Sequence, residues 1–207
     1  MKKALLLIVV VLLLAVTPVA AQRMCEECGG GGCSTLIFTS DAPSQIPNDT
    51  MWMEYISSTC DSITLRVMMK GDFLPPPAGG SNGAVSVNFH IDYDPEKVTW
   101  TGWSPRYFLI FTEFTPGCTG HISICGPNAA GDSLFCGHNR IPAATCGHEF
   151  GNNESRQLAV YTWTRTTSQI FTQQMDFSAE SLLNSDGLPM HVENWYGGRI
   201  QKLQSGG

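Results

Sequence analysis

Apolar and polar residues alternate most regularly between residues 83 and 103. From Val85 to Tyr93 every second residue is apolar or aromatic, and the residues between them are polar. Because side chains on a strand point alternately to opposite faces, this pattern predicts a long strand with one buried face and one wet face. Asp94-Pro95 then forms a pair typical of a type I turn. Val98 and Trp100 resume the alternation, so a second strand is expected there.

Short apolar runs bounded by turn residues recur along the rest of the chain. They predict strands at 35–39, 62–70, 106–114, 120–124, 157–164, 170–179, 190–195 and 199–203, while 51–56 is ambiguous. Ser178–Asn184 could instead form one or two helical turns with Ser178 as the N-cap. This succession predicts the all-β class, as a two-layer antiparallel β-sandwich. In it, the apolar face of Val85–Tyr93 would pack against faces such as Ile63–Met69.

The first 21 residues have the order of a secretory signal peptide. Lys2 and Lys3 precede an apolar run from Ala4 to Val16, and small residues follow at Val19-Ala20-Ala21. The apolar run is shorter than the ~20 residues that span a bilayer. We therefore expect cleavage, with no membrane span afterwards, and an uncleaved anchor is the alternative. The predicted location is secreted, extracellular or cell-surface, with the periplasm as an option.

The remaining chain divides by composition into an arm and a domain. Residues 22–60 are expected to form a Cys/Gly-rich arm with a first strand, and residues 61–207 the sandwich, with a Cys-rich insertion at 116–153. Removing Lys2 and Lys3 from the 12 basic residues leaves 10 against 18 acidic ones, a net charge of −8. Such an acidic protein repels phosphate backbones, so nucleic acid is not an expected partner.

The eight cysteines all follow the predicted signal peptide. An even number in an oxidising compartment indicates disulfides. We expect pairing within two groups along the sequence, although the connectivity within each group stays open. Cys25-x-x-Cys28 has redox spacing, but the glycines that follow disfavour the helix a redox pair needs, so a structural role is expected. The disulfide candidates are Cys25, Cys28, Cys33 and Cys60, and then Cys118, Cys125, Cys136 and Cys146.

Three sets of side chains are candidates for binding. Cys136 and His138, with Cys146 and His148, form two C-x-H pairs that could hold zinc, unless both cysteines are in disulfides and both histidines are solvated. Asn88, His90 and Asp92 share the wet face of the organising strand. They form a partner surface, a site for a hard cation such as calcium, or a plain solvated face. Among the aromatic residues, Trp195 and Tyr196 are the pair expected to be exposed and able to stack on a sugar, while most of the others belong in the core.

No catalytic signature is present, so no catalytic residue and no cofactor are predicted beyond the open calcium and zinc options. The chain has no G-x-S-x-G, no H-E-x-x-H and no phosphate loop. His148-Glu149 is not followed by a second histidine at the required spacing.

The organising strand also carries a family resemblance. Val85–Pro95 has the form V-x-V-x-F-x-I-x-Y-D-P and is followed by a short apolar strand at Val98–Trp103. With Ile63–Met69 before it and Arg156 opening 157–164, this resembles the cohesin-type β-sandwich and its carbohydrate-binding relatives. The resemblance implies a cohesin-like jelly roll that is secreted or surface-bound, is not an enzyme, and binds a protein module or a polysaccharide. The cysteine-rich arm and the Cys/Gly/His insertion depart from the pattern.

Three functions follow, in order of preference. The first is a secreted, non-catalytic binding module for extracellular or cell-surface assembly. The second is a structural subunit of a filament or matrix, which self-associates when the arm Gln22–Thr35 adds a strand to a neighbour's sheet. The third is a secreted zinc-dependent hydrolase that uses the C-x-H pairs.

Overall fold

The computed structural model describes residues 35–71, 84–105, 120–141, 155–184 and 192–203, which form eleven strands and no helix. The predicted signal peptide, residues 22–34 of the predicted arm, and the strand expected at 106–114 lie outside these residues. Among the described residues, accordingly, there is no helix that could cross a membrane. The strands are β1 (Leu36–Ser40), β2 (Thr50–Ser58), β3 (Ser62–Lys70), β4 (Ala84–Asp92), β5 (Val98–Pro105), β6 (Gly120–Pro127), β7 (Ser133–Ile141), β8 (Ser155–Arg165), β9 (Phe171–Asn184), β10 (Asn194–Tyr196) and β11 (Gly198–Lys202).

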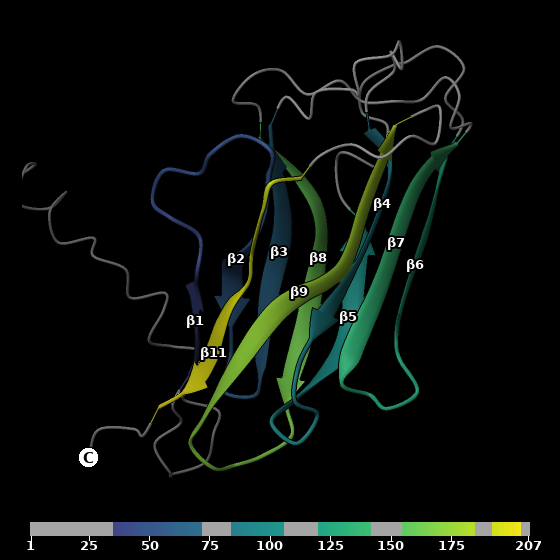
Figure 1. Ribbon diagram of the computed structural model, residues 1–207. Coiled ribbons are helices and arrows are strands. Elements are labelled where there is room, and N and C mark those ends of the chain that lie inside the picture. The colour runs from purple at the N-terminus through teal and green to yellow at the C-terminus, as the bar shows by residue number, and fades with distance from the viewer. Residues whose placement is uncertain (1–34, 72–83, 106–119, 142–154, 185–191, 204–207) are drawn as a thin grey trace, which may run out of the picture.

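The strands form two layers (Figure 1). One sheet has six strands in the order β1-β11-β9-β4-β7-β6, and the other has five in the order β10-β2-β3-β8-β5. All pairings are antiparallel except that of β10 with β2. The predicted all-β, two-layer sandwich is therefore confirmed. The organising strand is β4, which lies inside the larger sheet between β9 and β7.

The core lies between the sheets, as the alternation predicts. On β4, Val87, Phe89 and Ile91 are at most 1% exposed. On β3, the side chains from Ile63 to Met69 that alternate inward are also at most 1% exposed, and both sets belong to one cluster. Burial of such side chains contributes about 1.5–3 kcal/mol each, so this interface is the main source of stability.

The helical option for Ser178–Asn184 is wrong. These residues continue β9, and their backbone pairs with β4, where Ser178 lies opposite His90. Strand pairing with β4 satisfies the backbone at Ser178 and from Ser181 to Asn184, on either side of a register shift. That tertiary gain outweighs the weak helical preference of a short local sequence.

The segment expected as an insertion carries two strands of the larger sheet. One short strand was predicted at 120–124. The structure instead has a hairpin of β6 and β7, and β7 pairs with β4 along its length. Leu134, Cys136 and His138 alternate inward on β7 and are all 0% exposed. The sequence did not reveal this period-2 pattern as a strand, because Cys136 and His138 are residue types that suggest a disulfide or a metal site in a loop.

Candidate binding face

The outward side chains of β9, β4, β7 and β6 form one continuous face, called the outer face below. On β4, Asn88, His90 and Asp92 all lie on it, half-buried and alternating with the core residues. His90 lies between Phe135 of β7 and Ser178 of β9. The structure therefore brings together the three β4 residues that the sequence singled out.

Part of the outer face is apolar. Ile124 on β6 is 61% exposed and Phe135 on β7 is 37% exposed. The Phe135 ring lies 5.3 Å from the His90 ring, measured between centroids, and His90 Nδ1 lies 3.2 Å from Ser133 Oγ. Asn88 lies opposite Gly137, where an added Cβ would lie 2.8 Å from the side-chain oxygen Oδ1 of Asn88. This region offers apolar contact beside hydrogen-bonding groups.

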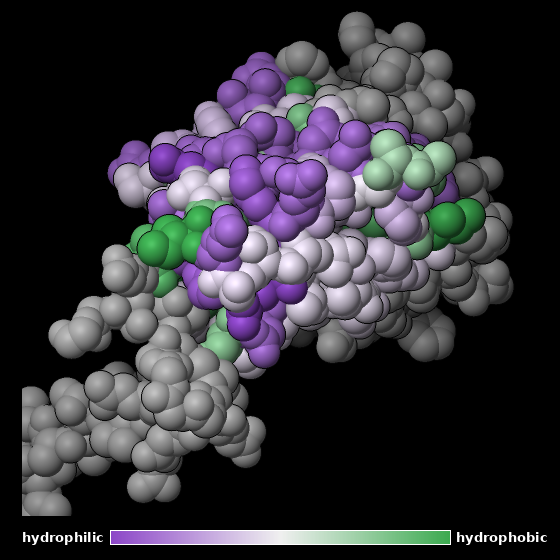
Figure 2. Space-filling model, turned by 90° about the horizontal axis from the view of Figure 1, so that it is seen from below, coloured by the Kyte–Doolittle hydropathy of each residue, from purple (hydrophilic) through white to green (hydrophobic). Residues whose placement is uncertain are grey.

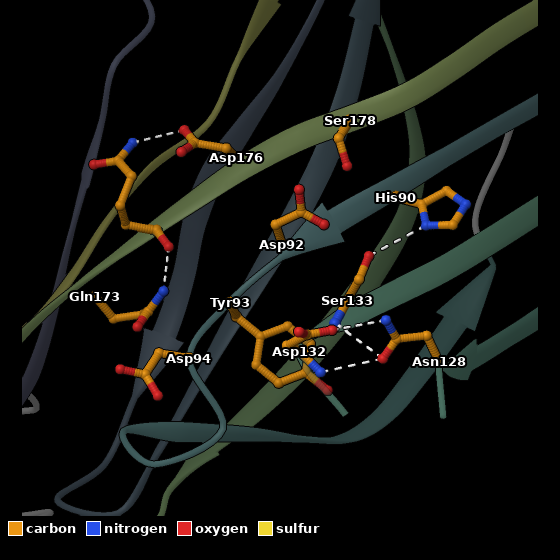
Figure 3. A pocket seen from close by; sticks show the side chains of 11 residues that line it. His90, Asp92, Tyr93, Asp94, Asn128, Asp132, Ser133, Gln173, Asp176 and Ser178 are labelled. Atoms are coloured by element: carbon orange, nitrogen blue, oxygen red, sulfur yellow. Dashed lines mark hydrogen bonds between the residues drawn. The ribbon is translucent and has the colours of Figure 1, made fainter. Parts of the chain in front are cut away.

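An acidic pocket of about 650 Å³ opens where β4 ends and β7 and β9 begin (Figure 3). The residues that line it include no lysine or arginine. The end of the molecule that carries it is largely hydrophilic, with its apolar residues in small separate groups (Figure 2). The pocket contains four carboxylates, those of Asp92, Asp94, Asp132 and Asp176.

Some of these carboxylates already have partners within the protein. Asp94 Oδ1 accepts the Glu96 backbone N–H at 2.9 Å, and Asp94 Oδ2 lies 3.1 Å from Lys97 Nζ. The backbone N–H and then the lysine hold the pKa of Asp94 below its ordinary value. Asn128 Nδ2 donates to Asp132 Oδ1 at 2.7 Å. Burial, and then the charge of Asp132, raise the pKa of Tyr93 beside the pocket.

Two other features of the pocket are unfavourable in the isolated protein. Asp92 and Asp176 lie directly opposite each other on β4 and β9, and like charges in that position destabilise a sheet. Gln173 is 5% exposed, and its carbonyl oxygen Oε1 has no hydrogen-bond partner within the described part of the chain. A buried acceptor without a partner costs about 1–3 kcal/mol. The opposed carboxylates make positive charge favourable in this pocket.

The predicted aromatic pair lies elsewhere. Trp195 and Tyr196 are on β10, at the edge of the five-stranded sheet, and both are half-buried. The Trp195 ring packs on Phe177 at 5.5 Å. All five tryptophans are buried or half-buried. The structure therefore does not join Trp195 and Tyr196 to the β4 residues, and no exposed tryptophan is present on the described surface.

A cluster of metal-ligand residues lies inside the sandwich. Cys136 and His138 share a face of β7, as their spacing allows, and Cys125 of β6 joins them. The sulfurs of Cys125 and Cys136 are 2.7 Å apart, and both residues are thiols in this structure. Within the described residues, only Cys125, Cys136 and His138 bring three ligand atoms within 4.8 Å of one another. The carboxylates of the acidic pocket do not bring three ligand atoms this close together.

The sequence did not indicate Cys125 as a neighbour of Cys136, because its pattern did not predict β7. The other predicted zinc ligands, Cys146 and His148, lie outside the described residues. So do Cys25, Cys28, Cys33 and Cys118. Cys60 is buried at 5% exposure.

Fold and site together define a two-layer β-sandwich whose larger sheet has an outer face with apolar and acidic groups. No protein-family model matches the chain, and no curated protein matches it. Among solved structures, cohesin modules have a similar fold. The OlpC cohesin of Clostridium thermocellum, solved with a dockerin, aligns with a TM-score of 0.49 and 12% identity over 69% of this chain and 86% of its own.

Two further cohesins align in the same way. The second type II cohesin of the ScaA scaffoldin of Acetivibrio cellulolyticus gives a TM-score of 0.47 and 12% identity, over 79% of this chain and 86% of its own. A non-cellulosomal cohesin from the archaeon Archaeoglobus fulgidus gives 0.42 and 10%, over 79% and 88%. These likenesses concern the arrangement of strands.

Proposed function

We propose that the protein is a secreted, non-catalytic module that binds a partner protein through the outer face and its acidic pocket. The observation that carries the proposal is the pocket. Like charges oppose each other across two strands, and a buried glutamine acceptor lacks a donor among the described residues. A lysine or arginine side chain of a partner would neutralise the opposed carboxylates of the pocket that Gln173 also lines. Charge-assisted hydrogen bonds of this kind are roughly twice as strong as neutral ones.

The rest of the outer face suits a protein better than a sugar. Ile124 and Phe135 offer apolar area beside the His90 ring, as the centre of a protein interface does. Four strands about 4.8 Å apart and about 30 Å long span roughly 600 Å² in projection. That approaches the ~800 Å² per partner of a standard interface. Sugar binding would favour exposed tryptophan, and the described surface has none.

Dockerin modules are the first partners to test, because cohesins solved in complex with them are among the similar structures. The filament and zinc-hydrolase hypotheses depend on residues 22–34 and on Cys146 and His148, which lie outside the described residues. They stay predictions.

The test is binding of a panel of purified dockerins to the immobilised mature chain, measured by interferometry. Ile124→Arg places a long cation on the outer face and should weaken binding at least tenfold. Ile56→Arg is the matched control, because Ile56 is exposed at 41% on β2 in the other sheet. It should leave binding unchanged.

Asp176→Asn tests the pocket itself. Removing one of two opposed charges should stabilise the free protein by about 0.2–1 kcal/mol and weaken partner binding. Binding should also lose part of its salt dependence, since one charge pair is gone. The proposal would be overturned by a partner that binds both Ile124→Arg and Asp176→Asn as tightly as it binds the unchanged chain. It would also be overturned if no protein of the panel binds while an insoluble polysaccharide does.

A further inference from the structure

We propose that Cys125 and Cys136 form a cross-strand disulfide that fixes the β6–β7 hairpin at the edge of the outer face. The sequence left the partners of both cysteines open. Here the register pairs them directly, Cys125 of β6 opposite Cys136 of β7. The proposal concerns the interior of the sandwich and does not depend on which partner binds outside.

Backbone geometry permits the bond. Directly opposed residues of an antiparallel pair have Cα atoms about 4.5–5.5 Å apart, within the ~4.4–6.8 Å that disulfides span. Both side chains point inward, since Cys136 is 0% exposed and Cys125 packs against the same core. The sulfurs are 2.7 Å apart, so no other atom lies between them.

A metal ion shared by the same residues fits less well. Two thiolates bound to one tetrahedral zinc, each at about 2.3 Å, would hold their sulfurs about 3.8 Å apart. The observed separation is about 1 Å shorter. The imidazole is also engaged elsewhere. His138 Nδ1 lies 3.0 Å from Ser123 Oγ, and Nε2 lies 2.9 Å from Tyr161 Oη.

The environment of the two thiols gives an order to the oxidation. Cys125 is half-exposed at the sheet edge, so an oxidant reaches it first. Cys136 is enclosed, and burial raises the pKa of its thiol, which keeps it protonated and unreactive toward solvent. His138 Nε2 lies 3.9 Å from Cys125 Sγ, within reach of a weak sulfur hydrogen bond.

The oxidant is a disulfide donor, either a small disulfide or an exchange protein of the oxidising compartment. The Cys125 thiolate attacks one donor sulfur, forms a mixed disulfide and releases one donor thiolate. Cys136 then loses its proton and attacks Cys125 Sγ, which forms the internal bond and expels the second donor thiolate. The two cysteine protons end on the two released thiols. The cysteines are oxidised and the donor disulfide is reduced, so the exchange balances.

The bond would secure the part of the outer face that is least supported. β6 is an edge strand, paired only with β7 among the described strands, yet it carries the exposed Ile124. A short loop closed by a disulfide should raise the unfolding temperature by roughly 6–12 °C for a domain of this size.

The experiment is non-reducing peptide mapping of the full chain, expressed with its leader, collected from an oxidising compartment and alkylated before digestion. Trypsin alone leaves residues 107–140 in one peptide, because no lysine or arginine precedes Arg140 there. Added cleavage before Asp132 separates Cys125 from Cys136. We expect these two peptides to stay joined and to separate on reduction. Fragmentation between residues 118 and 125 distinguishes Cys118 from Cys125.

Three results would overturn the proposal: both thiols alkylated, either cysteine joined to Cys118 or Cys146, or one equivalent of zinc with both thiols reduced. Cys125→Ala/Cys136→Ala should lower the unfolding temperature by the stated amount. Cys118→Ala leaves the 125–136 link intact. If the double variant fails to fold, the mapping of the natural chain still decides.

Discussion

The sharpest prediction compares one chemical change on the two faces of the same sheet. Phe89 of β4 is 0% exposed, with its ring 5.5 Å from Phe177 and 6.3 Å from Tyr161. Phe135 of β7 lies on the opposite, outer face and is 37% exposed. Replacing each by alanine removes the same atoms from the same sheet, in two different environments.

The structure sets the expected magnitudes. Phe89→Ala removes a fully buried ring and leaves a cavity, which costs about 3–5 kcal/mol of unfolding free energy. Phe135→Ala removes a side chain that already meets water and should cost about 1 kcal/mol. In urea, with an m-value of about 2 kcal/mol/M, the first change shifts the midpoint by ~2 M and the second by ~0.5 M.

The assay is urea unfolding followed by tryptophan fluorescence and by circular dichroism, together with partner binding. Phe89→Leu is the milder variant if the alanine form fails to fold. Binding should show the reverse order, since Phe135→Ala weakens it and Phe89→Leu does not. Equal stability losses for Phe89→Ala and Phe135→Ala, or a larger loss at Phe135, would refute the assignment of inner and outer faces.

Three further changes test single contacts by the same unfolding measurement. Gly197→Ala should cost about 3 kcal/mol or more, because its Cβ would come 1.8 Å from the Met175 carbonyl oxygen. Tyr161→Phe should cost about 1–3 kcal/mol by removing the buried hydroxyl that meets His138 Nε2 at 2.9 Å. Asp94→Ala should cost about 1 kcal/mol and Asp94→Asn less, since asparagine keeps the turn acceptor. Because the pKa of Asp94 is lowered, its charge stabilises the fold above pH 3.8 and this contribution is lost as the pH falls through the lowered value, a loss that Asp94→Asn lacks.

The sequence predicted the inner and outer faces of β4 because a strand of period 2 reveals them directly. Val87, Phe89 and Ile91 point inward, and Asn88, His90 and Asp92 point outward, as expected. β7 has the same period but was missed. Its inward positions Leu134, Cys136 and His138 include two residues whose chemistry suggests metals, disulfides or loops before it suggests a core.

The pocket could not be predicted from any one segment. Its residues come from the end of β4, the β6–β7 turn and the start of β9, which only the sheet order brings together. Asp92 was a candidate by itself. Its opposition to Asp176 depends on the register of β9 against β4, and that register includes irregularities that local patterns do not encode. The pairing of Cys125 with Cys136 could not be predicted either, because it depends on the register of β6 against β7.

The residues between the sheets stabilise the fold, and the outer face is the proposed binding surface. The pocket is lined by residues of both kinds. Along β9, Phe171, Gln173 and Met175 occupy successive inward positions and all are buried. A leucine or methionine at position 173 would fill the same place without an unpaired carbonyl, so glutamine there costs stability in the free protein. Under the proposed function, a partner that binds only the folded state would offset this cost by mass action. An inner residue that fits the core poorly therefore lines the pocket at which we propose that a partner binds.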